Sequence, residues 1–160
     1  MTDIAARPPA DVPPGVRSTP TEDQLSAWRS FLRAHATVIR VLESELVADQ
    51  DLSLAAYDVL VQLAEAPERR LRMTELADAV LLSRSGVTRL VDRMENAGLV
   101  SRCRVASDGR GVAAQLTDVG LSRLRVASRT HLTGVLRHFI SRLSEDDLAT
   151  LERISRHLTG

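Results

Sequence analysis

Apolar residues recur at steps of three and four along most of the chain, the spacing that gathers side chains on one face of an α-helix. The first stripe follows Thr21, which with Gln24 three residues later forms a capping box. The apolar positions of this stripe are Leu25, Trp28, Leu32, Ala36, Ile39, Leu42 and Leu46. The pattern predicts a long amphipathic helix over residues 21–50.

Three shorter helices are predicted next. The first begins at Ser53 and stops before Pro67, because proline disfavours helical backbone in the residue ahead of it. The second is capped by Thr74, and the third is capped by Ser83 and ends at Gly98, where a left-handed cap is expected. The third helix has one apolar face, made of Val87, Leu90, Val91 and Met94. The last two helices form a predicted helix-turn-helix.

Strand-like sequences surround these helices. A brief strand is predicted at residues 71–73, and two longer strands at residues 99–105 and 112–116. Between the longer strands lies Asp108-Gly109, a strong hairpin signal. A helix-turn-helix followed directly by a β-hairpin is a winged helix, so the expected fold is mainly α (α+β): a winged helix-turn-helix flanked by long N- and C-terminal helices.

Two amphipathic helices follow the hairpin, one capped by Thr117 and one by Ser144. Their stripes comprise Leu121, Leu124, Leu132, Val135, Leu136, Phe139 and Ile140, then Leu148, Leu151, Ile154 and Leu158. Five of the six prolines lie in the first twenty residues, which predicts a disordered arm. The expected domains are the arm over 1–20, a helical dimerisation region over 21–50 and 117–160, and a DNA-binding winged helix-turn-helix over 51–116.

Composition and length narrow the class of protein. At 160 residues and 44% hydrophobic content, the chain can form one domain or two small intertwined ones. It has a single cysteine, Cys103, no signal-like N-terminus and no apolar run of about 18 residues, so we expect a cytoplasmic protein without a membrane partner. The net charge is zero but uneven: residues 69–110 carry nine Arg and five acidic side chains, whereas residues 1–68 carry five Arg and eleven. The basic part is the predicted winged helix.

The helix after Ser83 has the residue types that reading DNA requires. Opposite its apolar face lie small polar side chains and arginines, namely Arg84, Ser85, Gly86, Thr88, Arg89 and Arg93. A helix enters the major groove only if its exposed face allows close approach, and Arg can then reach guanine edges or phosphates. A solvated amphipathic helix explains the same side chains about equally well when the segment is considered alone.

The predicted hairpin tip presents Arg110 beside Asp108 in a turn flanked by glycines. A guanidinium on a narrow loop suits the minor groove, and the strand residues Arg102 and Arg104 would lie along the phosphates leading there. The alternative is an ordinary charged hairpin with an Asp108–Arg110 ion pair, which contributes little on a surface. Taken alone, the tip favours this alternative.

Several segments fit one pattern without a gap: Leu76-Ala77, residues 83–95, Gly98-Leu99-Val100, Asp108-Gly109-Arg110 and residues 116–120. The pattern resembles the core of the MarR family of regulators, over roughly residues 21–158. The resemblance implies a homodimer whose first, fifth and sixth helices interlock and whose winged helices bind a pseudo-palindromic site on double-stranded DNA. It also implies base-edge contacts by Arg84, Ser85, Thr88 and Arg89, a phosphate contact by Arg93, and a minor-groove contact by Arg110 oriented by Asp108.

Many MarR relatives are repressors released by small phenolic or other aromatic acids, so the resemblance implies a small-molecule effector. Trp28, His35 and Tyr57 are the candidate ligand-binding residues, with packing as the alternative role for Trp28 and Tyr57. We expect no cofactor and no metal site, because no histidine has metal-ligand spacing to another histidine or to cysteine. Cys103 has no resolving partner, so a redox role is not expected.

The sequence therefore favours a sequence-specific DNA-binding transcriptional regulator, expected to be a repressor that acts as a homodimer. The alternative is a winged-helix module for protein interaction without specific DNA binding. An enzyme is a distant third, because the sequence has no Gly-rich phosphate loop, nucleophile elbow, paired-carboxylate motif or metal motif.

Overall fold

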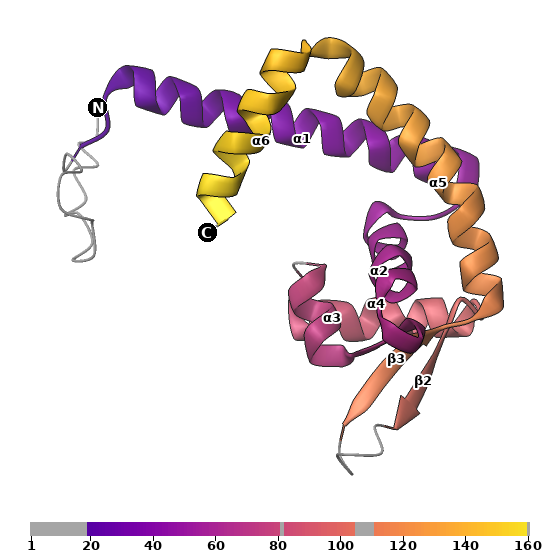
Figure 1. The fold of residues 1–160 in the computed structure, drawn as a ribbon. Helices are drawn as coiled ribbons and strands as arrows, with labels where there is room; N and C mark the ends of the chain where they lie inside the picture. The colour runs from indigo at the N-terminus through magenta and orange to yellow at the C-terminus, as the bar shows by residue number, and fades with distance from the viewer. Residues whose placement is uncertain (1–18, 81, 105–110, 160) are drawn as a thin grey trace, which may run out of the picture. The chain divides into compact units, whose positions relative to one another are not determined.

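The computed structural model describes residues 19–80, 82–104 and 111–159, and within them the chain folds into helices and one small sheet (Figure 1). The helices are α1 (Glu22–Gln50), α2 (Leu54–Glu65), α3 (Met73–Ala79), α4 (Arg84–Asn96), α5 (Asp118–His138) and α6 (Glu145–Thr159). The strands are β1 (Arg70–Arg72), β2 (Val100–Arg104) and β3 (Val112–Leu116). The chain divides into two units within α1, the first ending at Thr37 and the second beginning at Val38.

Most helices begin at the predicted caps. The backbone N–H of Thr21 donates to Gln24 Oε1 at 2.8 Å, and that of Gln24 donates to Thr21 Oγ1 at 3.3 Å. Ser53 accepts from the N–H of Ala56 at 3.2 Å, which places the start of α2 as expected. Such caps satisfy N–H groups that have no carbonyl partner in the first turn of a helix.

Two helix boundaries differ from prediction. The expected cap at Thr74 is wrong: α3 already begins at Met73, directly after β1, and the backbone N–H of Arg72 donates to Glu75 Oε2 at 2.9 Å. The predicted stripe of the fifth helix also runs too far. Phe139 leaves the helical conformation, with φ −125° and ψ −66°, and a 3₁₀ turn follows at Ile140–Arg142.

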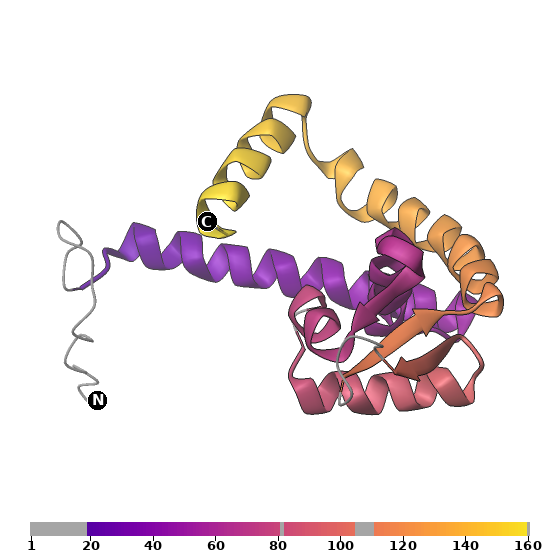
Figure 2. The ribbon, with the colours of Figure 1, turned by 60° about the horizontal axis from the view of Figure 1, so that its bottom comes forward.

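The predicted hairpin and brief strand form one antiparallel sheet in the order β1-β3-β2. Leu71 pairs with Ala114, and Val100 pairs with Leu116. Figure 2 shows α4 running alongside this sheet. The segment α2 to β3 thus has the helix, helix-turn-helix and hairpin order of a winged helix, a term used below for residues 51–116. The hairpin tip, with Asp108 and Arg110, lies outside the described residues.

The core lies inside the winged helix and extends into its flanking helices. Its fully buried larger side chains are Leu46, Leu60, Leu63, Leu76, Val59, Val87, Val91 and Val100. Leu46 belongs to the end of α1, and α5 adds Leu124 and Ala127 to the same cluster. The winged helix therefore shares one apolar core with parts of the two long helices, which anchors it to them.

A close approach joins the end of α4 to the start of α5. Thr117 caps α5 by accepting from the N–H of Gly120 at 2.9 Å, and its hydroxyl donates to the carbonyl of Gly98 at 2.7 Å. A Cβ on Gly120 would lie 2.0 Å from the carbonyl oxygen of Leu99. Only a residue without a side chain fits there, which gives a physical reason for the Thr-x-x-Gly spacing.

Apolar side chains remain exposed on the long helices. In the second unit, Leu132 and Leu136 of α5 are 58% and 57% exposed, and Leu158 of α6 is 70% exposed. No residue of α6 is buried. In the first unit, Trp28 and Phe31 of α1 are exposed. Among the described residues, no helix is both long enough and apolar enough to cross a bilayer.

Candidate nucleic-acid interface

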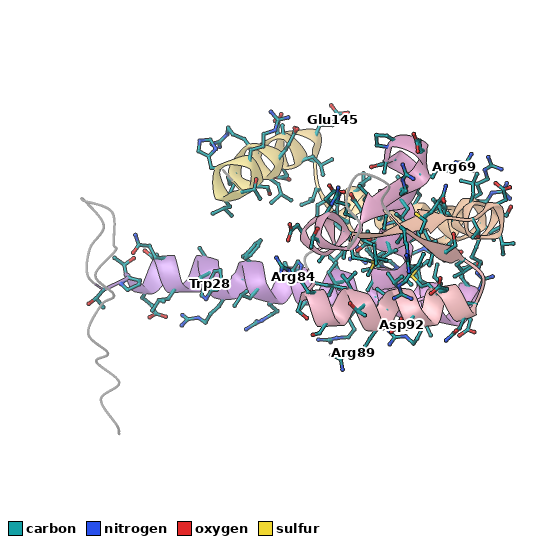
Figure 3. All side chains as sticks on the ribbon, turned by 90° about the horizontal axis from the view of Figure 1, so that it is seen from below. Trp28, Arg69, Arg84, Arg89, Asp92 and Glu145 are labelled. Carbon is teal, nitrogen blue, oxygen red and sulfur yellow. The ribbon has the colours of Figure 1, made fainter. Side chains whose placement is uncertain are left out.

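Helix α4 has one buried face and one exposed face, as its sequence predicts. Val87, Leu90, Val91 and Met94 are buried, and each is at most 4% exposed. Five of the side chains exposed outside this buried face are here called the reading face: Arg84, Ser85, Thr88, Arg89 and Arg93; Asp92 and Asn96 are exposed as well. Figure 3 shows Arg84 and Arg89 projecting from this helix. The reading face thus combines guanidinium groups with small hydroxyl side chains, a combination that allows close approach to a groove.

The start of α4 is built by a cap that needs a small residue nearby. Ser83 accepts from the N–H of Gly86 at 3.1 Å. A Cβ on Gly86 would lie 3.1 Å from Ser83 Oγ, tighter than an ordinary contact. The structure therefore gives Gly86 a local role in shaping the first turn, while its proposed proximity to DNA stays a prediction.

The end of α4 is also fixed by its own backbone. Gly98 has φ +71°, and its N–H donates to the carbonyl of Glu95 at 2.9 Å. The N–H of Leu99 donates to the carbonyl of Met94 at 2.9 Å. This pair of bonds is a Schellman motif, so the predicted left-handed cap at Gly98 is confirmed.

Arg102 lies against α4, where two carboxylates flank its guanidinium. Its Nη2 is 2.6 Å from Asp92 Oδ1, and its Nη1 is 2.5 Å from Glu95 Oε2. Partial burial lowers the pKa of Arg102, but the hydrogen bonds and charges of Glu95 and Asp92 more than offset it, so the pKa is raised. The sequence predicts a phosphate contact for this residue. In the structure its guanidinium is already paired with the carboxylates of Asp92 and Glu95 on α4.

The structure describes only some of the other predicted wing residues. Arg104 is exposed at the last position of β2. Asp108 and Arg110 lie outside the described residues, so the minor-groove contact stays a prediction. Cys103 of β2 is partly buried, and its Sγ donates to the carbonyl of Ala113 at 3.8 Å.

The three candidate ligand residues lie in two different units. Trp28 and His35 belong to the first, where Phe31 stacks between them, with ring centroids 6.1 Å from Trp28 and 6.4 Å from His35. Tyr57 belongs to the second, is 7% exposed, and packs on His131 at a centroid distance of 4.5 Å. Packing thus accounts for Tyr57, and a ligand role for the three residues stays a prediction.

Sequence reasoning missed His131, which is unusual in this structure. Its Nδ1 is buried and has no hydrogen-bond partner within the described ranges. Burial lowers the pKa of His131, although the Asp58 carboxylate partly opposes this. Burial also raises the pKa of Asp58. The position of His131 on the α5 stripe, seven residues after Leu124 and four before Val135, is the signal that could have indicated a packed histidine.

Replacing His131 with phenylalanine is expected to stabilise the protein, and more strongly in acid. Phenylalanine keeps a ring against Tyr57 and removes the unpaired nitrogen, whose burial costs about 1–3 kcal/mol. Because the folded pKa of His131 lies below its unfolded value, the unfolded chain binds more protons, and stability falls as pH drops below about 6.5. Thermal unfolding at pH 7.5 and 5.5 measures this. His131→Phe should raise the midpoint more at pH 5.5, whereas the exposed-site control His157→Phe should not; equal gains at both pH values would contradict the assignment.

Metal-binding geometry is not found in the part of the chain that the structure describes: it contains no group of three or more His, Cys, Asp or Glu side chains that could hold an ion. The exposed arginines on the reading face of α4 suit an anionic partner.

Comparison with known proteins identifies the fold and the family. The family model described as MarR family matches residues 50–111. The HTH-type transcriptional regulator PecS of Dickeya dadantii (strain 3937) is 30% identical over 115 residues, which cover 68% of this chain and 68% of that protein.

Two solved structures from Streptomyces coelicolor resemble the chain over most of its length. Sco3205, a MarR family transcriptional regulator in complex with DNA, matches with a TM-score of 0.84 and 35% identity, covering 88% of this chain and 92% of that one. AbsC, a MarR family transcriptional regulator, matches with a TM-score of 0.80 and 37% identity, covering 91% and 99%. The predicted winged-helix fold is therefore confirmed, and the chain belongs to the MarR family of transcriptional regulators.

Proposed function

We propose that this regulator binds double-stranded DNA in a sequence-specific manner as a homodimer and represses the genes next to its site. The observation that carries the proposal is the reading face of α4, which exposes Arg84, Arg89 and Arg93 beside two small hydroxyl residues. Support also comes from Sco3205, a relative whose structure contains DNA. Repression is the proposed outcome because a dimer seated on promoter DNA keeps other proteins from the same groove.

The contacts on DNA follow from the residue types. Ser85 and Thr88 are short enough to bring the helix close to base edges, and Arg84 and Arg89 have the forked donors that match guanine. Arg93 and Arg104 are exposed and suit phosphates. Arg110 with Asp108 is proposed for the minor groove.

A second copy of the chain is the proposed partner of the exposed apolar helices. Helix α6 spans 15 residues without a buried one, and isolated helices of about that length are marginally stable in water. Its Ile154 and Leu158, like Leu132 and Leu136 of α5, need an apolar surface to cover them. Two-fold dimers are the commonest oligomers, and they match a pseudo-palindromic DNA site.

We also propose a function for each part of the chain. Residues 51–116 bind DNA, residues 21–50 and 117–160 pair the two copies, and residues 1–20 form an arm. Leu46 and Leu124 are packed in the core of the winged helix, so the two functional regions share a physical boundary rather than a linker. A small aromatic effector is also proposed, with Trp28, His35 and Tyr57 as the candidate ligand-binding residues.

Footprinting the purified protein on the DNA upstream of its own gene tests the proposal. The expected result is protection of two half-sites centred about one helical turn, roughly 34 Å, apart. Affinity should also weaken steeply as salt rises, since each neutralised phosphate contributes about −0.9 to the slope of log Kobs against log[salt]. A protein-interaction module would give no protected half-sites and only the weak binding of any basic surface. A protein free of DNA affinity at low salt would rule out the proposal.

A further inference from the structure

One residue of the hairpin binds three positions of α4 at once. Arg102 of β2 contacts Asp92 and Glu95 through its guanidinium, and its Nη2 also donates to the carbonyl oxygen of Thr88 at 3.3 Å. Its backbone N–H donates to Glu95 Oε1 at 2.8 Å. One residue of the strand is therefore joined to α4 by its main chain and its side chain together.

These contacts constrain the orientation of α4 as well as its distance from β2. Positions 88, 92 and 95 are spaced by four and three residues, so they lie on one side of α4 and span about 10 Å of its axis. A single contact would let a helix roll about its axis or tilt against the sheet. Contacts spread over two turns oppose both movements. The contacts of Arg102 with Asp92 and Glu95 are also charge-assisted hydrogen bonds between ionised side chains.

The two elements joined in this way are the two that the proposed function places on DNA. Thr88 belongs to the reading face, and its carbonyl accepts from Arg102 while its side chain is exposed. Strand β2 ends at Arg104, which is proposed to contact a phosphate. The angle between α4 and β2 therefore sets how the reading face is oriented relative to Arg104.

The charges around Arg102 argue against direct phosphate binding. Its side chain is 25% exposed and lies between two carboxylates, so one positive charge faces two negative ones. A phosphate could compete for the guanidinium only by displacing Asp92 or Glu95, and it would be repelled by the carboxylate that remains.

We propose that Arg102 is a positioning residue that holds the hairpin and the reading helix at the angle required by the DNA grooves, and that it neutralises no phosphate itself. This inference rests on the proposed DNA-binding function. It predicts an unusual combination: substitution of Arg102 reduces affinity for the specific site, yet leaves the salt dependence of binding unchanged.

The test measures Kobs for the footprinted duplex and for an unrelated duplex over a range of salt concentrations. Arg102→Ala should weaken specific binding at least tenfold and leave the slope against log[salt] within experimental error of the parent. Arg102→Lys should restore the specific affinity only in part, because one ammonium group cannot bridge both carboxylates in the same geometry. Arg93→Ala is the matched control: a lost phosphate contact should reduce the slope by about 0.9 per subunit. A similar reduction in Arg102→Ala, or unchanged affinity, would overturn the inference.

A second variant tests the same point from the opposite side and keeps Arg102 in place. In Asp92→Asn/Glu95→Gln the guanidinium loses its carboxylate partners and becomes available to phosphates. The slope should then increase in magnitude, and the ratio of specific to unrelated affinity should fall. If Arg102 already contacted a phosphate in the parent, the slope would stay the same.

A DNA-free measurement separates this inference from the proposed function. Hydrogen exchange of the α4 amides at positions 88–95 should become faster in Arg102→Ala than in the parent, while exchange in α2 stays unchanged. Equal protection of α4 in both proteins would show that Arg102 does not hold the helix, whatever the protein binds. Conversely, if the parent fails to bind DNA but exchange accelerates, the DNA-binding proposal is lost and Arg102 keeps only the role of holding α4 against β2.

Discussion

The double substitution Arg84→Ala/Arg89→Ala is expected to lower affinity for the specific DNA site by at least a hundredfold. Both side chains are exposed on the reading face of α4. Each would occur twice in the proposed homodimer. A well-placed arginine contact to a base contributes about 1–3 kcal/mol, and 1.4 kcal/mol corresponds to a tenfold change in affinity. Fluorescence anisotropy on the footprinted duplex, at one fixed salt concentration, measures the loss.

Folding should be unaffected by this double substitution, because the cap at Ser83 and the buried face of α4 remain. Thermal unfolding should therefore match that of the parent. Arg33→Ala is the control for lost charge alone, since Arg33 is exposed on α1. It should leave specific affinity within about twofold. An equal loss in the control would mean that overall charge, not the reading face, determines binding.

Gly120→Ala is expected to destabilise the protein by about 3 kcal/mol, the upper end for inserting a single carbon into a packed site. The new Cβ would meet the Leu99 carbonyl oxygen at 2.0 Å and Leu116 Cδ1 at 2.8 Å. To relieve these contacts the start of α5 must move away, which breaks the hydrogen bonds of Thr117 to Gly98 and Leu99. Thermal unfolding should show a midpoint lower by about 10 °C.

The neighbouring residue provides the control for this substitution. Val119 is 61% exposed in the same first turn of α5, so Val119→Ala should change stability by no more than about 0.5 kcal/mol. A Gly120→Ala protein as stable as the parent would mean that α5 starts at a larger distance from Leu99 than described here.

The sequence was sufficient for features that depend on neighbouring residues. Ser53, Ser83 and Thr117 each accept from an N–H three residues ahead, so the information that starts these helices lies within one turn. The buried face of α4 follows directly from its periodicity. The boundary at Thr74 was wrong because β1 runs straight into α3, and the chain turns helical as soon as the strand ends.

The sequence was insufficient where partners come from another element. Arg102 resembles a phosphate ligand in a basic hairpin, and its partners Asp92 and Glu95 lie on the preceding helix, ten and seven residues away. The pattern around Gly120 was visible, but its cause is a carbonyl group 21 residues earlier in the chain. The unpaired nitrogen of His131 likewise follows only from tertiary packing.

Helix α6 has no buried side chain, so its order could depend on the concentration of the regulator in the cell. If pairing with a second copy is what orders α6, its folding free energy includes an association step and so depends on the amount of protein present. On dilution, α6 would lose its order while the winged helix, with its own core, stays folded. The copy number at which pairing begins would then set a threshold below which the chain persists as a folded monomer unable to occupy both half-sites.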